Sequence, residues 1–367
     1  MDPSYRLNHP DRSLHLDLIK CVSMIPMPFI HVASMMLIEG LNAPSLTQGQ
    51  ITAMFGPLHN FGPPVFLFCM GCGVVMTRHN SAPELAQRGL KTIRMGLELN
   101  LIRFTLYYLL KGLLLEPAVL PYAWYWLIGS DILPCAGMSL LALSAAREWE
   151  LPERAVLGFG LLCAAGQMLL PSITLSGTAG SLLGNFVFVE GGGSYFPLVS
   201  WMLFPCLGYF YQTKLRKIKR PGRFHLILGL SCASLFAASY AFLKRRGKWK
   251  KRYLFWGEMG DRMDLPTTWF TCLFGGIYLS VTYGLARLLE RHPMRKAITA
   301  FSRLVTAFYC IHWVVLMLTY LICQLRGLGR FLRRRRDVLA LGGGLLIVSA
   351  LLSGCWGALK ARNRNAG

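Results

Sequence analysis

Three ionisable side chains in the first apolar stretch of the chain, Asp17, Lys20 and His31, are of types that could do chemistry. Ionisable groups are costly inside a bilayer and are therefore functional candidates by default. Lys20 and His31 are eleven residues apart, which is about 1,100° on an α-helix and returns to nearly the same face after a rise of about 16 Å. Pro26 and Pro28 lie between them, so a kink would change this alignment. The spacing predicts a cation that binds an anion at one membrane face and an imidazole base deeper in the bilayer.

A carboxylate, Asp131, is placed to assist that imidazole. It lies about seven residues from the outer end of its own apolar stretch, as His31 does from the end of the first. A carboxylate at this depth could accept the Nδ1 proton of the imidazole, fix its tautomer and leave Nε2 free as a base. We therefore predict His31 and Asp131 as catalytic residues. The alternative is that each is a polar residue hydrogen-bonded between helices.

These side chains must be held by membrane-spanning helices. The chain has 367 residues, of which 54% are hydrophobic and 15% charged, and this excludes a disordered chain and an ordinary water-soluble one. About ten stretches approach or exceed the roughly 20 apolar residues that a spanning helix needs. They cover residues 16–38, 58–76, 92–115, 124–146, 154–170, 196–213, 224–243, 266–288, 298–323 and 337–359. The sequence predicts an all-α, polytopic membrane bundle of about ten transmembrane helices.

Lys and Arg side chains near the ends of these stretches predict which side of the membrane each end faces. In the first half of the chain they place the N-terminus in the cytosol, and an even number of spans then places the C-terminus there as well. The predicted organisation is a cytosolic segment at 1–15, a membrane domain at 16–359 and a cytosolic tail at 360–367. Loops 244–265 and 324–336 carry eight and six basic residues but fall on the outer side. Either a late span is miscounted, or these loops face an acidic partner or lipid headgroups.

Composition also bears on partners and cofactors. A net charge of +22 could indicate nucleic-acid binding, but that needs basic residues on a water-soluble surface, so we predict a lipid bilayer and no nucleic acid as partner. Cys69 and Cys72 form a Cys-x-x-Cys pair with no histidine or further cysteine beside it. We therefore predict no metal. The oligomeric state is not predicted.

The first stretch resembles a family signature, in which a basic residue is followed by ten residues and a histidine, here LDLIKCVSMIPMPFIHV. This is similar to the acyltransferase-3 family and to the wider superfamily of membrane acyltransferases that includes heparan-alpha-glucosaminide N-acetyltransferase. Four further passages resemble it in the same order: FGPPVFLFCMGCG at 61–73, SDILPCAGMS at 130–139, YFPLVSWMLFPCLGY at 195–209 and LVTAFYCIHWVVL at 304–316. One departure is Lys20, where the acyltransferase-3 pattern usually has arginine; the charge is kept but the bidentate fork is lost.

The resemblance implies an enzyme that moves an acyl group from a cytosolic acyl-CoA to an acceptor on the other side of the membrane. The co-substrate would be acetyl-CoA or another acyl-CoA, with its phosphates bound by Lys20, Arg78, Arg88 and Arg94. His31 would either deprotonate a hydroxyl or amine of the acceptor or carry the acyl group itself. We expect O-acetylation of a saccharide or glycolipid in the cell envelope, by a protein of the bacterial inner membrane.

Four more residues are candidates for the site that this resemblance implies. Arg103, which shares a helix face with Asn100, could polarise the thioester carbonyl or bind the donor; the alternative is a buried pair with an acid. His312 and Trp313 are predicted to line the acceptor site, against the alternative of a histidine satisfied in the core. Tyr195 follows a glycine run and is predicted to lie at the rim of the acceptor cavity.

A second class of function fits some of the same residues. A transporter or flippase of an anionic lipid-linked sugar could use His31, Asp131 and Arg103 to relay protons or ions. Transporters often contain an internal repeat, and the two halves of this chain show no convincing similarity. The order of five passages favours the enzyme, and a non-catalytic member of the same fold is a third reading.

Overall fold

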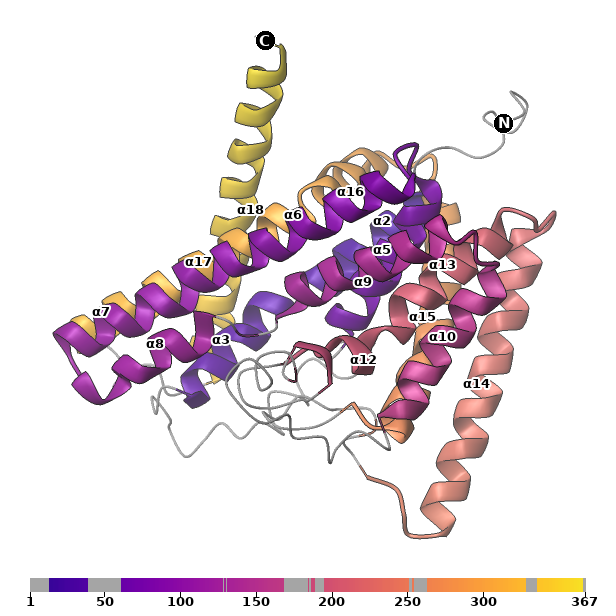
Figure 1. Ribbon diagram of the computed structural model, residues 1–367, viewed down its shortest axis with the longest axis horizontal. Coiled ribbons are helices and arrows are strands. Elements are labelled where there is room, and N and C mark those ends of the chain that lie inside the picture. Colours follow the sequence, from indigo (N-terminus) through magenta and orange to yellow (C-terminus); the bar gives the residue numbers. More distant parts are fainter. Residues whose placement is uncertain are drawn as a thin grey trace. The chain divides into compact units, whose positions relative to one another are not determined.

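The computed structural model describes residues 13–38, 61–127, 129, 131–167, 184, 186–188, 195–250, 253, 263–327 and 335–365. Helices are the only regular elements in these residues (Figure 1), which confirms the all-α prediction. The chain divides into two compact units. Unit 1 comprises residues 1–19, 63–96 and 129–295, and unit 2 comprises residues 20–62, 97–128 and 296–367.

Five helical segments in the described part of the chain are long and apolar enough to cross a membrane. They are Leu14–Met35, Pro221–Arg245, Leu265–Leu289, Val305–Leu325 and Arg336–Asn363. The second, helix α14, has 0% of its most apolar window buried, so its apolar surface is left for lipid. The chain is therefore an all-α integral membrane protein, and the count of about ten spans stays a prediction.

The first predicted span is divided at a proline. It forms α2 (Leu14–Met24) and α3 (Met27–Ile38), with Pro26 between them and Pro28 in the first turn of α3. Proline lacks the N–H that would continue a helix but is well suited to a first turn. Lys20 is thus on α2 and His31 on α3. Because the helix is broken between them, the rotation expected for one straight helix does not show which face each residue occupies.

Two further predicted spans are also interrupted. The stretch 92–115 comprises the end of α6 (Ala82–Asn100), a π-helical turn η2 (Leu101–Thr105) and α7 (Leu106–Leu114). The stretch 124–146 breaks between α8 (Leu120–Leu127) and α9 (Ile132–Glu148). Asp131 is the N-cap residue of α9, with an extended backbone at φ −97° and ψ 178°, and not a residue of a helix interior.

Unit 1 contains most of α5 (Gly62–Met76) and α6, together with α9, α10 (Glu153–Gly166), α12 (Leu198–Trp201), α13 (Leu203–Leu215), α14 (Pro221–Arg245) and α15 (Leu265–Leu289). Helix α10 packs on α13, and α14 packs on α15 (Figure 1). A Cβ added at Gly71 would clash with the carbonyl of Pro205, and one at Gly208 with the carbonyl of Phe68. Helices α5 and α13 therefore pack with their backbones in close approach, as small residues allow in membrane proteins.

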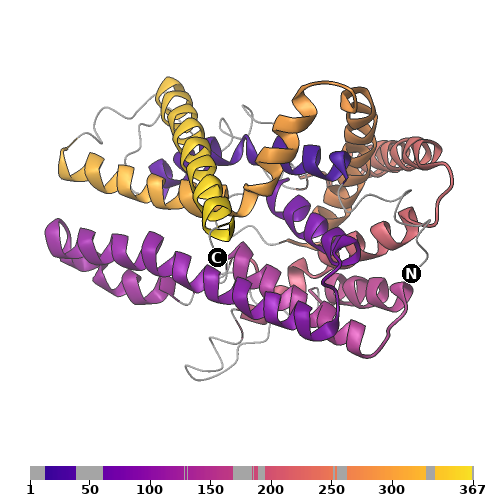
Figure 2. The same cartoon turned by 90° about the horizontal axis from the view of Figure 1, so that it is seen from above.

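Unit 2 contains α3, η2, α7, η3 (Pro117–Val119), α8, most of α16 (Met294–Arg303), α17 (Val305–Leu325) and α18 (Arg335–Asn365). Helix α18, yellow in Figure 2, contacts both α17 and α3. The apolar core of unit 2 includes Val32, Phe104, Tyr107, Leu316 and Tyr320. The hydroxyl of Tyr320 donates to the carbonyl of Val32 at 2.7 Å, which joins α17 to α3. These contacts hold α3 and α17 in one fixed arrangement.

Candidate active site

The structure brings two predicted site residues together in unit 2, His31 of α3 and His312 of α17. Nδ1 of His31 lies 2.8 Å from Nε2 of His312, and the ring planes are within 12° of parallel. His312 is completely buried, and its Nδ1 lies 3.1 Å from the carbonyl oxygen of Phe308, one turn earlier on α17. The three groups form a continuous chain of hydrogen bonds.

The hydrogen bonds determine which ring nitrogens carry protons. A carbonyl oxygen can only accept, so Nδ1 of His312 donates to Phe308. In the neutral ring Nε2 of His312 is then an acceptor, and Nδ1 of His31 must donate to it. The proton of neutral His31 is therefore on Nδ1, and Nε2 carries a lone pair. This is the state that a general base or a nucleophile requires.

Trp313 and Arg103 complete the cluster. The Trp313 ring stacks on His31 with centroids 4.2 Å apart, and the guanidinium carbon of Arg103 lies 4.6 Å from the Trp313 centroid. Arg103 is 2% exposed. Its Nη2 donates to Oδ1 of Asn100 at 2.9 Å, and its Nη1 lies 3.5 Å from the hydroxyl of Tyr309. A buried positive charge is therefore held close to the imidazole pair, from a π-helical turn of a kind often found at functional sites.

The remaining predicted residues are placed as follows. Lys20 lies on α2 in unit 2, while Asp131 begins α9 in unit 1. Tyr195 lies in a bend before α12 and is 37% exposed. The glycine run at 191–193 and most of the basic loop 324–336 lie outside the described residues, as does part of loop 244–265. The roles predicted for Lys20, Asp131 and Tyr195 stay predictions.

The arginines predicted for the donor are exposed and belong to unit 1. Arg88 and Arg94 lie on α6, and Arg78 lies in the short loop before it. The pKa of Arg88 is lowered because part of its side chain is buried. Within the described residues, no group of three or more His, Cys, Asp or Glu side chains could hold a metal ion.

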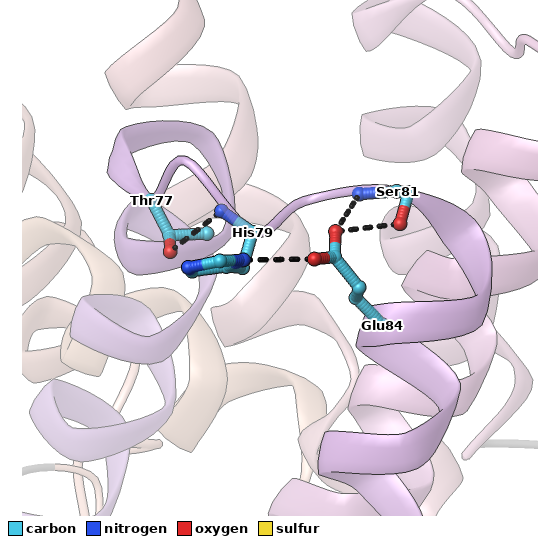
Figure 3. Close-up of polar contacts among 4 residues, drawn as sticks. All are labelled: Thr77, His79, Ser81 and Glu84. Carbon is cyan, nitrogen blue, oxygen red and sulfur yellow. Dashed lines mark hydrogen bonds and ion pairs between the residues drawn. The ribbon is translucent and has the colours of Figure 1, made fainter.

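Glu84 holds the short loop before α6 through His79 and Ser81 (Figure 3). Arg78 belongs to this loop. One of its carboxylate oxygens accepts from the backbone N–H of Ser81 at 3.1 Å and from its hydroxyl at 2.6 Å, and the other lies 2.8 Å from Nδ1 of His79. Glu84 thus satisfies the backbone N–H of Ser81 just before α6, which is one of the two bonds of a capping box. The hydrogen bonds from Ser81, followed by that from His79, lower the pKa of Glu84 to about 2. Because this pKa is lowered, the contribution to stability is complete above pH ~4.5 and is lost as the pH falls towards 2.

A comparison with known families identifies the chain. The family model for "Heparan-alpha-glucosaminide N-acetyltransferase, catalytic" matches residues 12–242. No curated protein and no solved structure matches the chain. The matched range includes His31 and Arg103 and ends before His312 and Trp313. This supports the wider likeness to membrane acyltransferases, and the narrower likeness to the acyltransferase-3 family stays a prediction. The chain belongs to the family of heparan-alpha-glucosaminide N-acetyltransferase catalytic domains.

Proposed function

We propose that this protein is a membrane acetyltransferase with His31 as its catalytic residue. It would move an acyl group, in the first instance acetyl, from cytosolic acyl-CoA to a hydroxyl or amine of a saccharide or glycolipid at the outer side. Family membership supports acetyl transfer with acetyl-CoA as donor. The observation that carries the proposal is the hydrogen bond from Nδ1 of His31 to His312, which leaves Nε2 of His31 with a lone pair.

In the direct route, Nε2 of His31 takes the proton of the acceptor as the acceptor attacks the thioester carbonyl. A carbon–oxygen or carbon–nitrogen bond forms, the carbon–sulfur bond breaks, and the imidazolium returns the proton to the departing thiolate of CoA. In the alternative route, Nε2 first attacks the thioester carbonyl, the carbon–sulfur bond breaks, and CoA leaves as its thiolate while His31 carries the acyl group. The acceptor then attacks this acyl group, the bond from the acyl carbon to Nε2 breaks, and Nε2 of the freed imidazole takes the proton of the acceptor. Both routes need the same tautomer of His31.

His312 takes the tautomer-fixing role in this proposal, because its Nε2 is the group at Nδ1 of His31. Asp131, for which that role was predicted, stays a second catalytic candidate. Arg103, fixed by Asn100 and stacked near Trp313, would stabilise negative charge on the thioester oxygen as the acceptor attacks. Trp313 offers the acceptor an aromatic wall beside His31.

Donor phosphates need cations, and the sequence offers them at the predicted cytosolic ends of the helices. Lys20, Arg78, Arg88 and Arg94 stay the predicted donor contacts. Tyr195 stays a predicted contact of the acceptor. The inner-membrane location with cytosolic termini also belongs to this proposal, whereas the integral membrane class rests on the apolar helices.

The test is acetyl transfer by the full chain in proteoliposomes. Radiolabelled acetyl-CoA is supplied with a panel of saccharide and glycolipid acceptors, and product and free CoA are both measured. We expect His31→Ala to lower the rate by about 10²–10⁴-fold, which is the usual contribution of a general base. The matched control is Cys355→Ala, because that side chain is exposed on α18 and has no role in the proposal. A wild-type protein that neither binds nor consumes acetyl-CoA, or a His31→Ala variant with full transfer, would contradict the proposal.

A further inference from the structure

A second candidate site lies in unit 1, in a cavity of about 490 Å³. Its walls come from the start of α2, the end of α5, the segment that joins α13 to α14, and the end of α15 with the residues that follow it. Its volume is within the range of small-molecule sites, about 300–1,000 Å³. Its described lining includes no member of the His31 cluster, so the chemistry proposed above leaves this cavity without a role.

The cavity is strongly basic. Arg216, Arg287, Arg291 and Arg295 line it, and among the lining residues that the structure describes the one carboxylate is that of Glu290. Glu290 accepts a hydrogen bond from Nη1 of Arg287 at 3.0 Å. Four guanidinium groups against one carboxylate attract an anion, and the planar fork of arginine matches the oxygen atoms of a phosphate group.

A buried acceptor in the same cavity indicates that the anion carries hydrogen-bond donors. Gln212 of α13 lines the cavity and is 8% exposed. Its Oε1 is buried and has no hydrogen-bond partner among the residues that the structure describes. A buried carbonyl oxygen is costly to leave unpaired. A ligand with an O–H or N–H group beside its phosphate would satisfy it, as the ribose and base of a nucleotide do.

A fixed aromatic ring forms another part of the wall. Tyr283 of α15 lines the cavity, and its ring stacks on His225 of α14 with centroids 3.8 Å apart and planes within 5°. His225 is held from both sides, by the hydroxyl of Tyr211 at 2.7 Å and the carbonyl of Pro221 at 2.7 Å. The aromatic wall is therefore rigid, and such a ring is a suitable surface for a sugar or a base.

All the walls lie at one predicted side of the membrane. The start of the first apolar stretch, the end of the second, loop 214–223 and the residues after 288 are the ends that the Lys and Arg rule places in the cytosol. Soluble nucleotides are therefore available to this face of unit 1. No contribution from unit 2 is needed to complete the cavity as described.

From these observations we propose that the cavity of unit 1 binds the phosphate groups of a nucleotide, with Arg216, Arg291 and Arg295 at the phosphates. Gln212 would accept from the ribose or base, and Tyr283 would lie against it. The nucleotide that the proposed function supplies is the 3′-phospho-ADP end of acyl-CoA, and to that extent the inference rests on the proposed function. It places the phosphates of this nucleotide at the cavity arginines, in place of the contacts predicted from the sequence at Lys20, Arg78, Arg88 and Arg94. A phosphatidylglycerol headgroup presents the same chemistry, a phosphate beside hydroxyl donors, and the experiment separates the two sources.

The experiment measures binding of 3′,5′-ADP and of CoA to the full chain in nanodiscs of phosphatidylcholine. We expect the double variant Arg291→Gln with Arg295→Gln to raise both dissociation constants at least about tenfold, which corresponds to the loss of charged phosphate contacts. Gln212→Leu should raise them less. Both arginines are exposed, so the double variant should fold, and its thermal stability is measured alongside. The matched control is Arg245→Gln, at the other end of α14.

Several outcomes would overturn the inference. One is unchanged binding in the double variant, and another is an equal loss in Arg245→Gln. A loss found in Arg78→Gln or Arg88→Gln and not in the cavity variants would place the nucleotide elsewhere. Phosphatidylglycerol added to the nanodiscs provides the lipid arm: binding that depends on the two arginines for the lipid but not for 3′,5′-ADP assigns the cavity to a headgroup.

The two proposals can fail separately. Binding of 3′,5′-ADP that depends on the cavity arginines, without any acetyl transfer by the wild type, would overturn the proposed function and leave the cavity inference standing. If acetyl transfer depends on His31 but nucleotide binding is the same in the cavity variants as in the wild type, the cavity inference is overturned and the proposed function stands. In either case His31→Ala should bind 3′,5′-ADP as the wild type does.

Discussion

At the scale of single residues, the state of His31 depends on a hydrogen-bond chain that ends within one helix. His312 donates to the carbonyl of Phe308, four residues earlier on the same helix, and this bond within α17 orients its ring. The rigid ring then presents Nε2 to His31 at 2.8 Å. Orientation of a base by a neighbouring group is what general-base catalysis requires.

We predict that His312 is a positioning residue for His31. His312→Phe keeps an aromatic ring in the buried site but removes the acceptor, so His31 loses its fixed tautomer. We expect kcat for acetyl transfer to fall by about 100-fold, the usual effect of a small misplacement of a catalytic group, with little change in KM for acetyl-CoA. Steady-state kinetics of the wild type and of His312→Phe in proteoliposomes measures this change.

His312→Gln is the matched variant, because its side-chain carbonyl can still accept from Nδ1 of His31. It should recover part of kcat, and the pH dependence of the rate should differ between the two variants. Equal losses in the two variants, or a loss explained by reduced thermal stability alone, would show that His312 is only a core residue.

Sequence reasoning could identify these residues but not their pairing. His31, Arg103 and His312 are candidates because polar groups are rare and costly in apolar stretches. His31 and His312 are 281 positions apart, and nothing in the local pattern of either residue indicates the other. The sequence favours Asp131 as the partner of His31 only because both lie at a similar depth in the predicted bilayer. Depth is a coarse measure, since many residues share the same depth.

At the scale of elements, composition locates apolar stretches better than it locates their breaks. The break at Pro26 has a local chemical cause that the sequence displays. The break between α8 and α9 also has local signals, because Gly129, Ser130 and Asp131 are turn and N-cap residue types and Pro134 follows them. Hydropathy averaged over the whole stretch hides this break, so 124–146 still reads as one span. Similarly, the predicted span 298–323 is two helices, α16 and α17, of which α16 is strongly amphipathic. Helix ends depend on packing that hydropathy does not report.

The close approach of α5 and α13 gives a prediction with an internal control. A Cβ at Gly71 would clash with the backbone of Pro205, whereas one at Gly73 would meet nothing within 4 Å. We expect Gly71→Ala to destabilise unit 1 by about 1–3 kcal/mol, because overpacked sites force the backbone to move. Gly73→Ala should be neutral or slightly stabilising, since alanine favours a helix.

Thermal denaturation of the detergent-solubilised protein measures this difference, with fluorescence-detected size exclusion as the readout. The midpoint for Gly71→Ala should fall below that of the wild type, and that for Gly73→Ala should not. If both variants melt at the same temperature as the wild type, the helices are not in backbone contact.

At the scale of the whole molecule, the basic residues are the least explained feature. The chain has a net charge of +22. Basic residues at the ends that are predicted to be cytosolic would follow the usual charge rule and could bind anions there. Loops 244–265 and 324–336 add fourteen basic residues at ends that the ten-span topology places outside. Helix α14 is the element on which this question turns, because basic residues precede and follow it.

We predict that α14 crosses the membrane, so that its two ends are on opposite sides. It has 25 residues, which gives a length of about 37 Å and exceeds the roughly 30 Å of a hydrocarbon core. Lys217→Cys, just before the helix, and Arg246→Cys, just after it, report the two sides in a Cys355→Ser background that removes an exposed native thiol. An impermeant thiol reagent applied to intact cells should label position 246 and not position 217 until the membrane is opened.

The opposite assignment has a definite consequence. If position 217 is labelled from outside and position 246 is not, α14 still spans, but the inner ends predicted for the nucleotide cavity face outward and cytosolic nucleotides cannot reach them. If both positions are labelled from the same side, α14 does not span, and the count of about ten helices is wrong in this region. If position 246 is labelled from outside and position 217 is not, as predicted, Lys244, Arg245 and Arg246 lie at the outer face, against the usual charge rule. Acidic headgroups or an acidic acceptor would then have to balance their charge.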